Sequence, residues 1–159
     1  MRIAFVHKTV PGSHKLLWEA IKCVRSFAEK FGTWTDIDNL SSQIAIAYGS
    51  DTPPIMLLVA LDDDERVRSH LIAVLDDFFG SRTMCILQWE KDKDFDLPAE
   101  LKLEAIEYLR LWATHNGVDK IRIFARNDRV AQLFESRYGF TRDERVQMTA
   151  SFDDITKIL

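Results

Sequence analysis

Glycine is scarce in this chain of 159 residues, which contains only six. None of the six lies between Gly80 and Gly117, a stretch that holds the clearest helical pattern in the sequence. Strand–loop–helix units often bind phosphate through a glycine-rich loop, because a residue without a side chain lets backbone N–H groups approach the anion. The segment "DFDLPAELKLEAIEYLRLWATHNG" (94–117) therefore enters its helix without such a loop.

Several other features are missing, and each absence excludes a class of protein. The cysteines, Cys23 and Cys85, form no CxxC pair and stand in apolar surroundings, so we expect buried free thiols in a reducing compartment. The four histidines form neither HxxxH nor HExxH, so no metal site is predicted. No apolar run approaches the roughly 18 residues of a membrane-spanning helix. The first residues, "MRIAFVHKTV", lack the hydrophobic region of a signal peptide, so we expect a cytoplasmic protein.

The charge balance gives no reason to expect nucleic acid or a membrane as partner. The formal net charge is −4, with 29% charged and 47% hydrophobic residues. Such a surface attracts neither the phosphate backbone of nucleic acids nor anionic lipids. A chain of this length and composition is expected to form one globular domain, residues 1–159, with a sizeable core.

The apolar pattern predicts an α+β domain. Strand-like runs occur at 2–6, 55–63, 69–80 and 82–91, and the last three follow one another closely, which is typical of an antiparallel meander. Helical spacing occurs at 14–32, where Ser13 is a candidate N-cap. Segment 36–51 fits a short helix through Leu40, Ile44 and Ala47, although its "QIAIAYG" also suits a strand.

The helix after residue 97 is predicted to bury one apolar stripe, formed by Leu101, Ala105, Ile106, Leu109, Trp112 and Ala113. Asp96 is its candidate cap, Glu100 favours its positive end, and Gly117 terminates it. A strand follows in "DKIRIFAR" (119–126), and the strand–helix–strand crossover predicts that its two strands are parallel.

A final helix is predicted within 127–139, with Asn127 as its N-cap and Gly139 as its terminator. The segment at 140–152 is strand-like again, with a break near 142–144. The predicted order is β-α-α-β-β-β-α-β-α-β-β.

This order resembles the GNAT superfamily, the acetyl-CoA-dependent N-acyltransferases. The residues that carry the resemblance are "YLRLWATHNGVDKIRIFARNDRVAQLFESRYGFTRDERVQMTASF" (108–152), in which "WA…NGV…I.I…N…A..LF…YGF" matches the second half of that fold. The pair "MLLVALDD…SHLIAVLDD" is similar to the family's central hairpin. The resemblance implies a mixed, mostly antiparallel, twisted sheet flanked by helices, with acetyl-CoA as the cofactor of active members.

The family's phosphate loop does not match this chain. Its Q/R-x-x-G-x-G/A motif, counted back from "WATHNGV", falls on 97–102, where Leu97 replaces the basic or amide residue. Glu100 and Lys102 replace the two glycines, and Pro98 removes an N–H donor. Negative charge is added by Asp94, Asp96 and Glu100. The resemblance is therefore to a degenerate member, and no cofactor is expected.

The resemblance also places catalytic residues. The general base of the family matches Glu90, whose alternative role is a solvated charge at a strand end. The general acid is usually a tyrosine on the last helix; Phe134 occupies the nearest matching position and cannot donate a proton. Tyr138 is the substitute acid, unless it only packs at the helix end. His70 is a further candidate base, or a structural histidine.

Cofactor-side residues are implied in the same way. Asn127 matches a cofactor-side asparagine, although it also suffices as an N-cap. Phe134, on the same predicted helix, is a further cofactor-side candidate. The strand "CILQWEK" (85–91) would line a groove where neighbouring strands splay apart, with Ile86, Leu87 and Gln88 against the pantetheine of an enzyme.

Two functions remain open from the sequence. The first is a binding or structural module that has lost acetyl-CoA chemistry and offers the groove to a protein strand or to a second copy of itself. Degenerate GNAT-like domains of this kind include phage internal virion proteins, so this interpretation extends to a phage-encoded, virion-located protein. The alternative is an active N-acetyltransferase that transfers an acetyl group to an amine of a small molecule or protein, with Glu90 as base and Tyr138 as acid.

Overall fold

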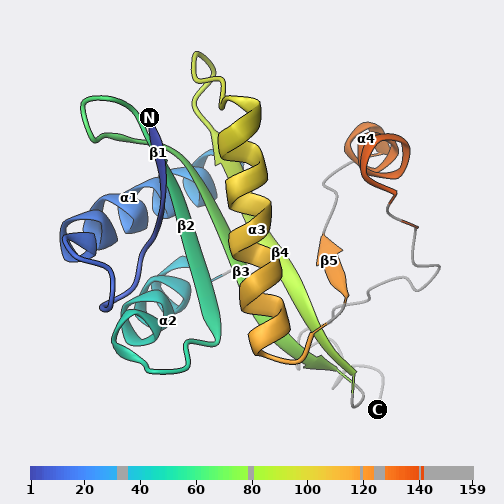
Figure 1. Ribbon diagram of the computed structural model, residues 1–159, viewed down its shortest axis with the longest axis horizontal. Coiled ribbons are helices and arrows are strands. Elements are labelled where there is room, and N and C mark those ends of the chain that lie inside the picture. The colour runs from blue at the N-terminus through green and yellow to red at the C-terminus, as the bar shows by residue number, and fades with distance from the viewer. Residues whose placement is uncertain (32–35, 79–80, 119, 124–127, 140, 142–159) are drawn as a thin grey trace, which may run out of the picture. The chain divides into compact units, whose positions relative to one another are not determined.

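The computed structural model describes residues 1–31, 36–78, 81–118, 120–123, 128–139 and 141. The chain forms two compact units, Met1–Phe124 and Ala125–Leu159. The first unit contains, in order, β1 (Arg2–Phe5), α1 (Ser13–Phe31), α2 (Ile37–Gly49), β2 (Ile55–Leu61), β3 (Val67–Phe78), β4 (Ser81–Lys91), α3 (Ala99–His115) and β5 (Ile121–Ile123) (Figure 1). The second contains α4 (Asp128–Tyr138).

The sheet of the first unit has the strand order β1-β2-β3-β4-β5. Neighbouring strands are antiparallel from β1 to β4, and β5 runs parallel to β4. The meander and the parallel crossover predicted from the sequence are therefore confirmed. The ambiguous segment at 36–51 is helical, and it buries Leu40, Ile44 and Ala47 as predicted.

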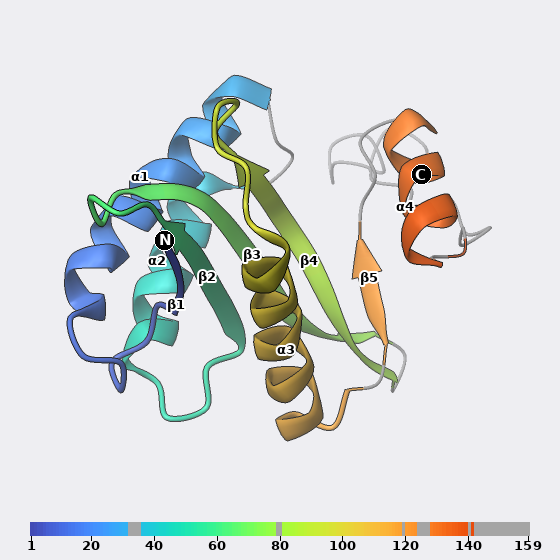
Figure 2. The same cartoon turned by 45° about the horizontal axis from the view of Figure 1, so that its top comes forward.

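Helices cover both faces of this sheet. Figure 2 shows α1 and α2 on one face and α3 on the other. The side chains of β2 alternate between two buried clusters, with Leu57 and Val59 facing α1 and α2, and Met56 and Leu58 facing α3. Every residue of β2 is buried, which explains why this strand reads as an uninterrupted apolar run.

The helix starts differ from the sequence predictions. Ser13 is the first residue of α1 and not its cap, and its hydroxyl donates a hydrogen bond of 2.5 Å to the carbonyl of His7. Asp36 caps α2 by accepting hydrogen bonds of 3.0 Å from the backbone N–H groups of Asp38 and Asn39. The prediction that Asp96 caps α3 is wrong: Pro98 holds the cap position, and no side chain caps this helix.

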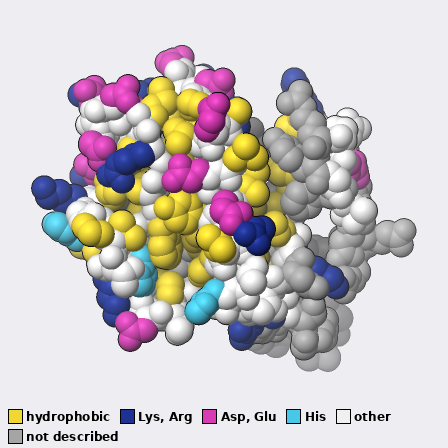
Figure 3. Space-filling view, in the orientation of Figure 1, with side chains coloured by type: hydrophobic (Ala, Val, Ile, Leu, Met, Phe, Trp, Pro, Cys, Tyr) yellow, Lys and Arg dark blue, Asp and Glu magenta, His cyan; other side chains and the backbone are white. Residues whose placement is uncertain are grey.

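The buried stripe of α3 is narrower than predicted. Leu109, Trp112 and Ala113 are buried, but Ile106 is 55% exposed. Three residues before Leu109, Ile106 is displaced by about 60° around the helix, which is enough to leave the face that meets the sheet. Figure 3 shows hydrophobic side chains at the surface where Figure 1 places α3. This helix therefore carries more apolar side chains than the sheet buries.

The helix ends were predicted well. Gly117 ends α3 with a φ of +68°, and the Val118 N–H donates to the carbonyl of Ala113 at 2.9 Å, which closes the last turn. Gly139 follows α4 with a φ of +67°. The predicted cap Asn127 and, apart from residue 141, the predicted strand segment at 140–152 lie outside the described residues. None of the described helices combines the length and apolar character needed to cross a membrane.

Candidate functional site

Within the described residues, one edge of β4 has no paired strand over about half of its length. β4 pairs with β3 from Ser81 to Lys91, whereas its pairing with β5 covers only Met84 to Ile86. Among the described residues, the stretch Leu87–Lys91 thus has a strand on one side only. The Asp92 N–H donates to the carbonyl of Arg68 on the β3 side at 2.8 Å. Because N–H directions alternate along an antiparallel strand, the N–H groups of Trp89 and Lys91 point to the open side.

A β-bulge marks the start of this open stretch. Ile72 of β3 pairs with Gln88 and Ala73 pairs with Ile86, so Leu87 has no partner on β3. Leu87 packs on the α1–α2 side of the sheet, whereas Ile86 packs on the α3 side. Bulges often lie at sheet edges and beside functional sites, where they redirect a side chain. The structure thus places the predicted groove residues Ile86, Leu87 and Gln88 at this irregularity.

A polar cluster lies on the α1 side of β3 and β4. His70 sits opposite Glu90 in the strand register, and its Nε2 lies 3.3 Å from Oε1 of Gln88. The Nε2 of Gln88 is buried and has no hydrogen-bond partner in the described part of the chain. Burial lowers the pKa of His70, although the hydrogen bond that the ring donates to Oε1 of Gln88 and the charge of Glu90 oppose this effect. The ring is therefore neutral at pH 7.

Glu90 is held in an ion pair and is not a free carboxylate. Its Oε1 lies 3.1 Å from Nζ of Lys30 on α1, and its side chain is 23% exposed. Both residues border a pocket of about 340 Å³ between α1 and the ends of β3 and β4, which His70 also lines. Glu90 is thus a partly buried, ion-paired carboxylate at a pocket and not a fully solvated strand-end charge.

The start of α3 carries negative charge. Glu100 lies in its first turn, and no side chain bonds its terminal N–H groups. Asp96 instead contacts two ammonium groups, those of Lys91 at 3.4 Å and Lys102 at 3.7 Å. A pyrophosphate at this helix end would meet Glu100 and Asp96, a proline in place of one donor, and no glycine. These residues do not fit the phosphates of acetyl-CoA.

The catalytic pair predicted from the sequence is divided between the two units. Glu90 belongs to β4 of the first unit, and Tyr138 is the last residue of α4 in the second. Phe134 also lies on α4, in the second turn from its end. The Tyr138 side chain and Asn127 are outside the described residues. The structure therefore groups Ile86, Leu87, Gln88 and Glu90 on β4 of the first unit.

The thiols offer no reactive nucleophile. Cys23 and Cys85 are free, but only Cys85 is buried, and Cys23 is half-buried. Burial raises the pKa of Cys85 to about 11 and also raises the pKa of Cys23. Both are thiols at neutral pH. In the described ranges, no cluster of His, Cys, Asp and Glu side chains is arranged to hold a metal ion.

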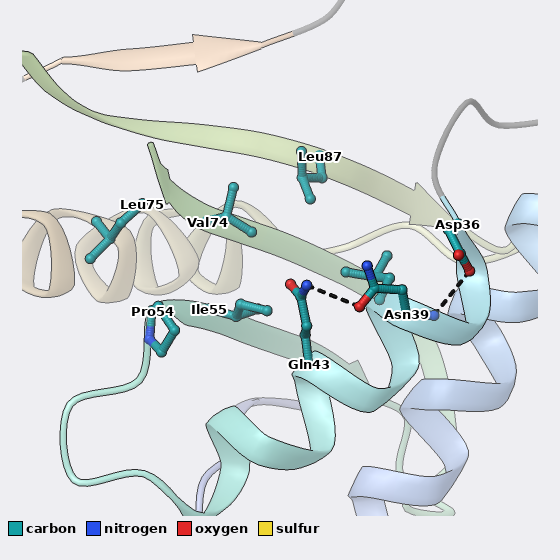
Figure 4. Close-up of a pocket in the computed structure, with 9 residues that line it drawn as sticks. Asp36, Asn39, Gln43, Pro54, Ile55, Val74, Leu75 and Leu87 are labelled. Atoms are coloured by element: carbon teal, nitrogen blue, oxygen red, sulfur yellow. Dashed lines mark hydrogen bonds between the residues drawn. The ribbon is translucent and has the colours of Figure 1, made fainter. Parts of the chain in front are cut away.

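A second pocket, which the sequence did not reveal, lies between α2 and the sheet. It has a volume of about 390 Å³ and lies beside Leu87 of β4 (Figure 4). Its polar rim comes from α2, and its apolar residues are Leu40, Pro54, Ile55, Val74, Leu75 and Leu87. The rim residues Asp36, Asn39 and Gln43 recur at i, i+3 and i+7, a helical spacing that could have indicated one polar face.

Solved structures with the same architecture are acetyltransferases. Ribosomal-protein-alanine N-acetyltransferase from Brucella melitensis biovar Abortus 2308 superposes with a TM-score of 0.61 at 15% identity, covering 96% of this chain and 100% of that one. Aminoglycoside 6'-N-acetyltransferase AAC(6')-Ih from Acinetobacter baumannii gives 0.63 at 13%, covering 94% and 97%. The aminoglycoside N-acetyltransferase AAC(6')-Iy, solved in complex with CoA, gives 0.64 at 16%, covering 94% and 93%.

The chain therefore has the GNAT fold, as the sequence resemblance predicted. No protein-family model and no curated protein sequence matches it. At identities of 13–16%, these superpositions establish the architecture and leave the chemistry to be argued from the site itself.

Proposed function

We propose that this chain is a GNAT-fold binding module that lacks ordinary acetyl-CoA chemistry and takes an extended peptide strand on the open edge of β4. The observation that carries the proposal is the unpaired side of Leu87–Lys91 among the described residues. An exposed strand edge with free N–H and C=O groups is a template for another strand. Peptide recognition by strand addition uses such an edge for affinity and side-chain pockets for specificity.

The site favours a peptide over a cofactor for electrostatic and chemical reasons. The α3 start presents Glu100 and a proline where a pyrophosphate would need donors. Glu90 is engaged by Lys30. Trp89, in contrast, is 51% exposed at the centre of the open edge, where an added strand would cover it. Buried aromatic side chains commonly dominate the energy of such contacts.

The absence of cofactor binding is tested by thermal unfolding. Acetyl-CoA and free CoA at millimolar concentration are expected to leave Tm unchanged, since the residues at the α3 start do not fit the pyrophosphate. A ligand at 100 times its Kd would stabilise the native state by about 2.7 kcal/mol and raise Tm by roughly 5–10 °C. A rise of that size, confirmed by calorimetry, would overturn this part of the proposal and favour the N-acetyltransferase alternative.

Strand addition is tested by selecting binders from a displayed library of random linear peptides. The decisive variant is Trp89→Pro, which removes one N–H from the open side of β4, with Trp89→Ala as its matched control. Proline is tolerated at an edge position whose N–H makes no hydrogen bond within the sheet. Loss of one backbone hydrogen bond costs about 0.5–1.5 kcal/mol, so the proline variant should bind selected peptides roughly 3- to 10-fold more weakly than the alanine variant.

Two results would contradict strand addition. Equal affinities of the proline and alanine variants would show that the backbone edge makes no contact. Failure of the library to yield any binder would remove the evidence for a peptide partner. A concentration-dependent dimer in light scattering, lost in Trp89→Pro, would make a second copy of the chain the occupant of the edge.

A further inference from the structure

The pocket between α1 and the ends of β3 and β4 is positively charged, although the chain as a whole is negative. Its volume is about 340 Å³, and its described lining contains six charged residues: Lys22, Lys30, Arg68, Glu90, Lys91 and Asp92. Four of them are basic and two are acidic, so this lining has a formal charge of +2, whereas the chain has −4. The pocket therefore attracts an anion and repels a cation.

Within the described residues, Lys22 is the one basic residue of this lining that no carboxylate engages. Each of the other three contacts a carboxylate: Lys30 with Glu90 at 3.1 Å, Arg68 with Asp92 at 2.7 Å, and Lys91 with Asp96 at 3.4 Å. The two acidic groups of the lining are thus already neutralised, which leaves them little attraction for an ammonium group. The exposed ammonium of Lys22 remains as the partner for an anion.

A buried ring in the same lining offers an unused nitrogen. His70 is 5% exposed, and its Nε2 donates to Oε1 of Gln88 at 3.3 Å, so Nδ1 of the neutral ring is an acceptor. Among the described residues Nδ1 has no hydrogen-bond partner, and yet it is not one of the unpartnered atoms that are sealed from solvent. Unused polar atoms on buried side chains are rare and call for a ligand or an ordered water.

We propose that this pocket binds a small hydroxycarboxylic acid, whose hydroxyl group donates to Nδ1 of His70 and whose carboxylate pairs with Lys22. The hydroxyl supplies the donor that the ring lacks, and it carries no positive charge into a positive pocket. The hydrocarbon part of the molecule lies against Cys23, Phe27 and Val67, which give the lining its apolar portion. A volume of about 340 Å³ is within the range of pockets that enclose a small organic molecule.

The test is an NMR titration of the full chain with mandelate, a hydroxycarboxylate with a phenyl group. A molecule of this size is expected to bind with a Kd on the order of 1–10 mM, and the shifted amide signals should be those of the pocket lining. Phenylacetate, which lacks only the hydroxyl, should bind about 3- to 10-fold more weakly. The diol in which a hydroxymethyl group replaces the carboxylate should also bind more weakly, because it has no charge to pair with Lys22.

Two lysine variants provide a matched comparison on α1. Lys22→Ala should weaken mandelate binding by about 2- to 5-fold, the range of an exposed ion pair. Lys15→Ala removes the same charge from an exposed position of the same helix outside the described lining, and it should bind mandelate as the wild type does. Both positions are exposed, so both variants are expected to fold, and thermal unfolding verifies this.

Three results would overturn the inference. The first is the absence of a saturable shift of the lining signals at ten times the expected Kd. The second is equal binding of mandelate and phenylacetate, or equal binding of mandelate to the two lysine variants. The third is tighter binding of benzylamine than of mandelate, because the pocket would then take an amine, as the N-acetyltransferase alternative requires. None of these results depends on a peptide at the edge of β4, so they leave strand addition to its own test.

Discussion

His70 is the most deeply buried ionisable side chain near the open edge. It is 5% exposed, packs edge-on against Phe27 with ring centroids 6.1 Å apart, and meets Gln88 and Glu90 on β4. Across from it, α1 contributes the charged group of Lys30, which is paired with Glu90. The Glu90 carboxylate opposite the ring is already neutralised by Lys30 and would stabilise a protonated imidazole only weakly. The fold therefore favours the neutral imidazole.

This burial predicts a specific loss of stability in mild acid. The pKa of His70 is lowered in the folded chain, so its effect is absent above the ordinary histidine pKa of 6.5. Below pH 6.5 the unfolded chain takes up a proton that the folded chain resists, and stability falls until the pH reaches the folded pKa. Urea unfolding should show that His70→Gln removes up to about 1.4 kcal/mol per pH unit of this slope. Because the variant also loses the packing of the ring, its absolute stability is not informative. The comparison is between the slopes of unfolding free energy against pH, and equal slopes for variant and wild type would contradict the prediction.

At the residue scale, the sequence located candidates but not their partners. The resemblance pointed to Glu90 and to the strand that contains it, and the structure adds a β-bulge at Leu87 that the sequence did not predict. The ion pair with Lys30 joins residues 60 positions apart, and no local pattern encodes such a contact. The buried amide of Gln88 was equally invisible, because its unsatisfied donor results from the tertiary packing around it.

Among the elements, α3 tests how well helical periodicity predicts which apolar side chains are buried. Leu109→Ala removes a side chain that is 7% exposed and should cost about 2–5 kcal/mol in the free energy of unfolding. Ile106→Ala, one turn earlier on the same helix, removes a side chain that is 55% exposed and should change stability by no more than about 0.5 kcal/mol. Chemical denaturation measures both, and similar costs for the two variants would mean that Ile106 is covered.

The same helix shows why its start was mispredicted. Asp96 is a good capping residue two positions before a helical pattern, and the sequence offered no reason to prefer Pro98. In the structure two lysines, Lys91 and Lys102, lie within 3.7 Å of the Asp96 carboxylate and hold it away from the cap. The contact with Lys91 spans the loop before α3, and the contact with Lys102 reaches into the helix. Which residue takes the cap position therefore depends on the geometry of this loop. Helix existence and helix ends were predictable here, and cap identity was not.

At the scale of the whole molecule, amide protection should map the sheet. β2 and β3 are interior strands with partners on both sides, so their amides should exchange most slowly in native-state hydrogen exchange. Along β4, the N–H groups that face β3 should exchange slowly, and those of Trp89 and Lys91 should exchange rapidly. NMR resolves the two sets residue by residue. Protection of the Trp89 amide equal to that of Gln88 would show that the edge is covered in solution.

The order of elements could be predicted because each element carries its own signal. Alternating and continuous apolar runs gave the strands, and the crossover rule gave the parallel pair of β4 and β5. The pocket between α2 and the sheet could not be found in this way. Its lining joins residues 36–43 to residues 54–55, 74–75 and 87, which come together only after the sheet has formed.

The extra residue in β4 has a consequence for changes in chain length. Leu87 and Gln88 both face the α1–α2 side, and the strict alternation resumes on either side of them. Excision of Leu87 would therefore shorten β4 by one position without turning any other side chain to the opposite face. A relative one residue shorter at this point would keep the same sheet and the same core, yet it would lack the leucine that lines the pocket beside α2. A single-residue deletion is thus a simple route by which this fold could lose one wall of a pocket without disturbing its sheet.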